Sequence, residues 1–143
     1  MQFRTLIPAV LGLMLLPGAA PMCDVSIDVD ALRSQKGLLQ FCLTRNAKVF
    51  PDCDKDPAAH RMTVSADTDV VHFSDIPPGE YAIAVLHDEN SNARLDTFAG
   101  IPREGVGFSR NPKISFGPPS FSKAQFDAES GAPRQKVRMR YFL

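Results

Sequence analysis

The sequence has little of several residue types: in 143 residues there is no tryptophan, and there are only two tyrosines and three cysteines. It also lacks an excess of charge of either sign, because sixteen lysines and arginines are balanced by sixteen aspartates and glutamates. A chain with no net charge has no long-range field to attract nucleic acid or an anionic lipid surface. We therefore expect no nucleic-acid partner.

Long hydrophobic runs are also missing, except near the N-terminus. Residues 1–20 combine a basic residue, Arg4, an apolar segment, Leu6–Leu16, and a run of small residues, Pro17–Ala20. The apolar segment of roughly 11 residues is shorter than the about 20 that span a bilayer, and the pattern is typical of a secretory signal peptide. The sequence predicts a signal peptide over 1–20 and one domain over 21–143, exported, periplasmic or secreted, with no transmembrane segment.

Three cysteines in an exported chain predict one disulfide and one cysteine left over. We expect the bond to join Cys42 and Cys53, because it would close the proline- and aspartate-rich loop that follows a strand. A closed loop of this size is stabilised by about 2–3 kcal/mol in the chain-entropy account. Cys23 is then either a buried, idle thiol or a lipidated N-terminus, although Met22 stands where a lipidation signal requires a small residue.

Short stretches of alternating polar and apolar residues predict strands, with little helical periodicity. In residues 24–30 the alternation turns Val25, Ile27 and Val29 to one side. Strands are predicted over 24–30, 38–45, 61–66, 70–73, 82–86, 113–116 and 134–143, and one helical turn within 120–126. This pattern predicts an all-β fold: a single antiparallel β-sandwich with Greek-key connections, or alternatively an open barrel.

The stretch 81–111 begins as an apolar strand and continues as a long polar loop. Loops beyond about 15 residues in a compact domain are usually functional or tied down. Oxygen-bearing residues stand at alternate positions in its first part, which is the pattern of a calcium-binding loop. The predicted ligands are Asp88, Asn90, Asn92, the carbonyl of Arg94, and Asp96.

The loop departs from the calcium-binding template in two places. The sixth position, normally glycine, is Ala93, and the twelfth, normally a bidentate glutamate, is Ala99. A helix-flanked site is therefore excluded, and a free-standing one needs further oxygens from Glu104 or water. Such a site is expected to be weak, with a Kd of about 10⁻⁴ to 10⁻³ M. The alternative is an Asx-rich loop closed by its own hydrogen bonds, without an ion.

No nucleophile paired with a base is evident, so we expect no enzymatic activity. Ser109 is not a nucleophile elbow, because Asn111 stands where the second glycine of that motif belongs. The enzymatic alternative is a metal-dependent hydrolase with a site at His87, Asp88 and Glu104. Only His87 offers nitrogen locally, whereas a zinc site takes three or four nitrogen, sulfur or oxygen ligands.

Phe98, Phe108 and Phe121 lie around the same loop in the sequence. Exposed together, they would suit a carbohydrate- or peptide-binding sandwich. Aromatic residues beside a long connection are also typical of a minor core beneath it. The sequence leaves both interpretations open.

Several short motifs follow one another in the second half of the chain: PPGEY at 77–81, HDEN at 87–90, LD at 95–96, GIP at 100–102, EG at 104–105, GFS at 107–109 and PSF at 119–121. In these motifs the chain resembles a family of uncharacterised exported bacterial proteins, domain of unknown function twenty-one forty-one. The resemblance covers essentially all of 21–143. It implies a secreted or periplasmic β-sandwich, prealbumin-like or immunoglobulin-like, with no assigned activity. The family usually has glycines near Ser91 and Ala93, so the loop of this chain is stiffer.

These observations together predict an exported, non-enzymatic binding or structural module. Its cofactor would be a weakly bound calcium ion in the loop 88–96, and its partner an extracellular ligand or protein.

Overall fold

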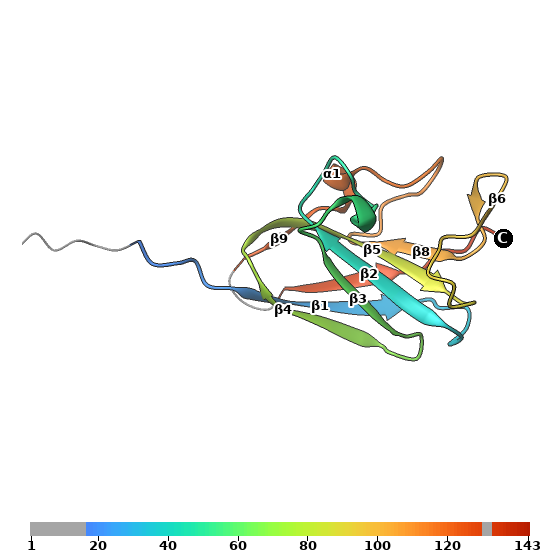
Figure 1. Ribbon diagram of the computed structural model, residues 1–143, viewed down its shortest axis with the longest axis horizontal. Coiled ribbons are helices and arrows are strands. Elements are labelled where there is room, and N and C mark those ends of the chain that lie inside the picture. The colour runs from blue at the N-terminus through green and yellow to red at the C-terminus, as the bar shows by residue number, and fades with distance from the viewer. Residues whose placement is uncertain (1–16, 130–132) are drawn as a thin grey trace, which may run out of the picture.

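The computed structural model describes residues 17–129 and 133–143, and its regular structure is almost entirely strand (Figure 1). Most of the predicted signal peptide, residues 1–16, lies outside the described residues. The chain is all-β, as predicted. Its elements are β1 (Cys23–Asp30), β2 (Leu38–Thr44), η1 (Cys53–Lys55), β3 (His60–Ser65), β4 (Val70–Ile76), β5 (Gly79–Asp88), β6 (Thr97–Phe98), β7 (Ile101–Pro102), β8 (Gly105–Phe108), α1 (Phe121–Ala124), β9 (Phe126–Ala128) and β10 (Arg134–Arg138). Within the described ranges, no helix has the length and apolar character needed to cross a membrane.

β1 is the middle strand of a three-stranded sheet with the order β10-β1-β4. It runs antiparallel to β4 but parallel to β10, so the prediction of a purely antiparallel fold is wrong for this pair. A parallel pair requires a long connection, and here nearly the whole chain lies between the two strands. On their outer face, acids of β1 meet bases of β10 in the ion pairs Arg134–Asp28 and Lys136–Asp30.

β2 and β5 are the middle strands of a larger sheet with the order β3-β2-β5-β8, and β9 also pairs with β5. The antiparallel register of β2 and β5 sets Leu39 opposite His87 and Leu38 opposite Asp88. The last two residues of β5 are therefore inside the sheet, although both are polar. The short strands β6 and β7 pair with each other in a separate hairpin.

The inner faces of the two larger sheets contribute to one hydrophobic core. The alternation predicted for β1 is confirmed, since Val25, Ile27 and Val29 are all buried. The other sheet supplies the matching face from β2 and β5. Core residues from these three strands and β10 are Val25, Ile27, Val29, Leu39, Phe41, Leu43, Ile83, Val85 and Val137.

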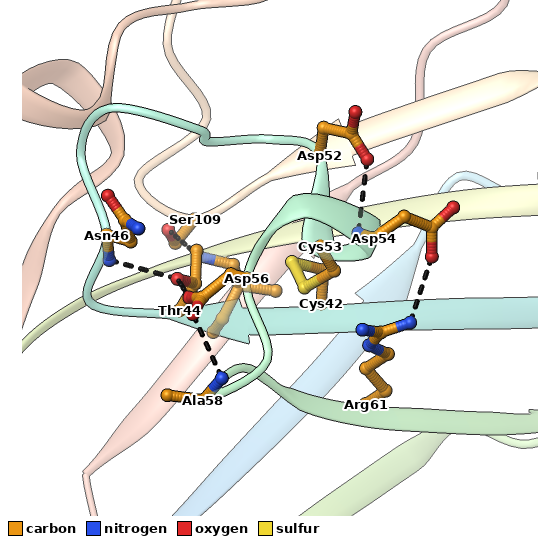
Figure 2. Close-up of a disulfide and its surroundings, with 11 residues drawn as sticks. Cys42, Thr44, Asn46, Asp52, Cys53, Asp54, Asp56, Ala58, Arg61 and Ser109 are labelled. Atoms are coloured by element: carbon orange, nitrogen blue, oxygen red, sulfur yellow. Dashed lines mark hydrogen bonds and ion pairs between the residues drawn. A yellow bond between two sulfur atoms is a disulfide. The ribbon is translucent and has the colours of Figure 1, made fainter.

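A disulfide joins Cys42 in β2 to Cys53 in η1, as predicted (Figure 2). In the connection that it holds, the buried Asp56 accepts hydrogen bonds from the hydroxyl of Thr44 and from the N–H of Ala58, the latter at 3.0 Å. The connection between β2 and β3 is thus fixed to the sheet by one covalent bond and a buried polar cluster.

The third cysteine, Cys23, is 1% exposed, and its thiol donates a hydrogen bond to the carbonyl of Glu129. A lipid on this sulfur would require the side chain to leave the core. The structure is therefore consistent with the buried-thiol interpretation.

Ser109, which follows β8, connects β5 to α1 by hydrogen bonds inside the protein. Its hydroxyl oxygen accepts the N–H of Ile83 at 2.9 Å, and its hydroxyl donates to the carbonyl of Ala124. The side chain is fully buried. Both hydrogen-bonding roles of the hydroxyl are therefore structural.

We expect Ser109→Ala to lower the free energy of unfolding by about 2 kcal/mol, because a buried N–H and a buried carbonyl lose their partner. Urea unfolding followed by circular dichroism measures the change. The control is Ser122→Ala on the exposed side of α1, which should shift the free energy by less than about 0.5 kcal/mol. Equal losses in the two variants would contradict this role of Ser109.

Candidate functional site

Asp88 is the last residue of β5 and is fully buried. One carboxylate oxygen, Oδ1, accepts the N–H of Asn92 at 3.1 Å. The other, Oδ2, accepts the N–H of Ala93 at 2.8 Å and the side-chain amide of Gln40 at 2.8 Å. Because two donors come from the loop and one from β2, Asp88 folds the start of the loop back against the sheet.

Asn90 and Asn92 continue this arrangement with Asx turns. The side-chain oxygen of each accepts the N–H two residues further on, at 3.2 Å for Asn92 and 3.0 Å for Arg94. Their amide groups donate to the same oxygen of Asp96, Oδ2, at 2.8 and 2.9 Å. Of the predicted ligands, the side chains of Asp88, Asn90, Asn92 and Asp96 thus belong to one hydrogen-bonded unit, whereas Arg94 is exposed.

Ser91 and Ala93 lie between these polar residues with φ values of 56° and 60°. This is the left-handed region, which favours glycine because a Cβ atom crowds the backbone there. In this chain the loop keeps the conformation with two residues that tolerate it less well.

Glu104 is the second buried acid of the site and is 5% exposed. Its Oε2 accepts the N–H of Asp96 at 3.2 Å, while its Oε1 is buried and has no hydrogen-bond partner in the described part of the chain. Burial raises the pKa of Glu104 to about 7, and the nearby carboxyl groups of Asp88 and Asp96 contribute. Below that pH the Glu104 carboxyl group is protonated, and its O–H group can form a hydrogen bond to Asp88.

The oxygens left for a ligand are few and acidic. Among the described residues, Oε1 of Glu104 and Oδ1 of Asp96 accept no hydrogen bond, and Oδ1 of Asp88 accepts only one. Hard cations such as calcium take oxygen ligands of this type. Across residues 17–129 and 133–143, however, no three His, Cys, Asp or Glu side chains are already grouped to hold a metal ion. A cation here would need adjustment of the side chains and several water ligands.

The loop borders an open hollow of about 630 Å³. Charged and amide side chains dominate its wall. The residues that line it are Arg33, Glu89, Asn90, Asn92, Asp96, Thr97, Arg103 and Glu104.

His87 precedes Asp88 and is also fully buried. Its Nε2 lies 2.8 Å from the carbonyl of Lys36, and its Nδ1 lies 2.7 Å from the hydroxyl of Tyr141. A carbonyl can only accept, so Nε2 carries the proton and the Tyr141 hydroxyl donates to Nδ1. The hydrolase alternative at His87, Asp88 and Glu104 therefore has no free nitrogen ligand in this arrangement.

Arg33 lies at the rim of the hollow and holds its parts together. Nothing in the sequence alone marks this residue. Its guanidinium group forms an ion pair with Glu89 and lies 4.5 Å from the centre of the Tyr141 ring. It also donates to the carbonyls of Arg103 at 3.1 Å and Leu143 at 2.7 Å. The same arginine holds the pKa of Glu89 below its usual range. One side chain thus joins the β1–β2 connection, the long loop and the C-terminus.

The three aromatic residues around the loop do not form a common surface. Phe98 is 65% exposed, whereas Phe108 is buried. Phe108 and Phe121 both pack edge-on against Phe50, with ring centres 5.9 and 6.0 Å apart. The minor-core interpretation therefore holds for Phe108 and Phe121, and only Phe98 is left for a ligand.

The chain is an all-β protein with one disulfide, in which an Asx-rich loop is anchored by two buried acids at the end of a sheet. Residues 27–136 match the family described as "Uncharacterized protein conserved in bacteria (DUF2141)", and the chain belongs to that family. The resemblance seen in the sequence motifs is thereby confirmed. No curated protein and no solved structure matches the chain.

Proposed function

We propose that this protein is an exported, non-enzymatic binding or structural module. Residues 1–20 would be removed as a signal peptide, leaving 21–143 as one periplasmic or secreted domain. The disulfide Cys42–Cys53 supports this location, because disulfides persist in oxidising compartments. Two sheets that share one core support a Greek-key β-sandwich, prealbumin-like or immunoglobulin-like.

We infer further that the loop takes a weakly bound calcium ion at Asp88, Asp96 and Glu104. The observation that carries this proposal is Oε1 of Glu104, which is buried beside two other carboxyl groups and has no hydrogen-bond partner among the described residues. A buried carboxylate with few hydrogen-bond donors is stabilised by a proton or by an opposite charge. At low pH the Glu104 carboxyl group is neutralised by its own proton. Once it has left, a hard cation matches the oxygen ligands better than zinc would.

In this proposal the ion stabilises the fold of the loop locally. It would replace the proton between Glu104 and Asp88 and so hold the end of the loop against its beginning. Asn90 and Asn92 would steady Asp96 through the amide hydrogen bonds already present. The carbonyl of Arg94 and water remain as further oxygen ligands. The loop would therefore be most rigid when calcium is bound.

A calcium titration followed by two-dimensional amide NMR tests the site, at a pH above the pKa of Glu104. We expect the signals of Asn92, Ala93 and Asp96 to shift together, with a Kd of about 10⁻⁴ to 10⁻³ M. Glu104→Gln should weaken this binding at least about tenfold, since it removes one charged ligand.

The matched control is Asp67→Asn, which neutralises an exposed acid between β3 and β4 and should leave the Kd unchanged. Absence of any saturable shift in the wild type would contradict the calcium proposal. So would equal affinity in the wild type and in Glu104→Gln.

A further inference from the structure

The hairpin formed by β6 and β7 projects from the protein. In the part of the chain that the structure describes, these two strands pair only with each other. The turn residues Ala99 and Gly100 have φ values of 51° and 78°. No described atom beyond its chain neighbours lies within 4 Å of a Cβ atom built on Gly100. Figure 1 shows the hairpin standing off from the sheets, near the C-terminal end of the chain.

The hairpin carries the exposed apolar residues Phe98 and Ile101, and a third, Leu95, lies two residues before β6. Phe98 is 65% exposed, Leu95 47% and Ile101 43%. Phe98 and Ile101 are cross-strand partners, so their side chains lie on the same face. Soluble monomers rarely gather large apolar side chains on one projecting surface unless it contacts something.

The charges presented around these apolar side chains are positive. Arg94 precedes them and Arg103 follows them; both are exposed and have no ion-pair partner among the described residues. Of the nearby acids, Glu104 is buried and Asp96 accepts two amide groups through Oδ2. Arg103 borders the same hollow as Asp96. Two exposed arginines without an ion pair in the described ranges therefore flank the base of the hairpin, one before β6 and one after β7.

We propose that this hairpin docks the protein onto an anionic lipid surface, with Phe98 and Ile101 inserted among the lipids and Leu95 beside the headgroups. Arg94 and Arg103 would then lie at the level of the headgroups, where guanidinium groups pair well with phosphate. A neutral chain is not drawn to such a surface from afar, so the arginines act only at contact, within about 8 Å at physiological salt.

A protein partner fits this tip less well than a lipid surface does. A stable protein interface buries about 800 Å² on each side, more than three side chains on a narrow turn supply. A bilayer interface, in contrast, accepts a small apolar projection flanked by basic residues. The proposal goes beyond the cation site and does not depend on it.

The absence of tryptophan gives a direct test. Phe98→Trp places a single fluorophore at the tip, and Phe116→Trp places one on another fully exposed phenylalanine, before α1. Both are titrated with phosphatidylglycerol and phosphatidylcholine vesicles in EDTA, so that no cation contributes. We expect a blue shift of the emission for position 98 with phosphatidylglycerol, a smaller one with phosphatidylcholine, and none for position 116.

Vesicle flotation of tryptophan-free protein provides the second readout, with the same N-terminus in every variant. Phe98→Ser combined with Ile101→Ser should reduce binding roughly tenfold with an unchanged unfolding midpoint, since both residues are exposed. Arg94→Gln combined with Arg103→Gln should remove the preference for phosphatidylglycerol.

Three results would overturn the proposal. The first is no emission shift at position 98, or an equal shift at position 116. The second is undiminished flotation of the serine variant. The third is a blue shift at position 98 that appears on raising the protein concentration without vesicles, which would assign the tip to a second copy of the chain.

Discussion

Glu104→Gln is expected to abolish most of the change in stability between pH 4.5 and 7, and to stabilise the protein above that range. The folded-state pKa of Glu104 is raised, from 4.5 to about 7. Between these values the folded state holds a proton that the unfolded chain releases, so stability falls as the pH rises. Glutamine carries no charge at any of these pH values, so the variant lacks the proton release that lowers the stability of the wild type.

The wild type should lose at most about 3 kcal/mol across this window, from the size of the pKa shift. Urea unfolding in EDTA at a series of pH values measures the loss. Glu80→Gln, the same change at an exposed position of β5, should keep the wild-type slope. If the slope persists in Glu104→Gln, another group is responsible and the assignment to Glu104 is wrong.

Asp88→Ala is expected to lower the free energy of unfolding by about 3–4 kcal/mol, because three donors lose a charged acceptor at once. Those donors are the N–H groups of Asn92 and Ala93 and the side-chain amide of Gln40. Hydrogen bonds to charged groups contribute about 1.5–3 kcal/mol each, and relaxation of the loop recovers part of the loss.

Chemical denaturation with circular dichroism measures this effect. Asp67→Ala serves as the control, because Asp67 is exposed and its side chain accepts no hydrogen bond in the described ranges. It should change the free energy by less than about 0.5 kcal/mol. A similarly small effect for Asp88→Ala would mean that the loop is held from elsewhere.

The elements predicted well from the sequence are those with a local signal. The alternation in β1 placed Val25, Ile27 and Val29 correctly in the core, because neighbouring side chains of a strand point to opposite faces. The apolar run at the centre of β5 likewise marked a strand within a sheet. The disulfide was predictable because only three cysteines were available and two flank one loop.

β8 is the clearest element that the sequence did not predict. It contains Gly105 and Gly107, which weaken strand propensity, and it was assigned to the long loop. The structure requires both glycines: a Cβ atom would lie 2.4 Å from the ring of Tyr141 at position 105 and 2.6 Å from Val137 at position 107. These contacts involve the far end of the chain. A strand at 113–116 was predicted but does not form.

The same distinction applies to the site: residues close in sequence were predictable, and residues from distant segments were not. The spacing of Asp88, Asn90, Asn92 and Asp96 indicated that their side chains would converge, and the loop brings them into one hydrogen-bonded unit. Gln40, which donates to Asp88, comes from β2, and Arg33, which pairs with Glu89, comes from the β1–β2 connection. Nothing in the sequence marks either residue. The raised pKa of Glu104 follows from burial, which only the fold determines.

Glu104 is a buried acid with a raised pKa, and in the proposed site a cation takes the place of its proton. The most direct test is thermal unfolding above the pKa of Glu104, in EDTA and in millimolar calcium, for the wild type and Glu104→Gln. For a weak site we expect calcium to add about 1 kcal/mol to the wild type and raise its midpoint by several degrees. Glu104→Gln should unfold at the same temperature in both solutions. No shift in the wild type, or an equal shift in both proteins, would contradict a calcium site at Glu104.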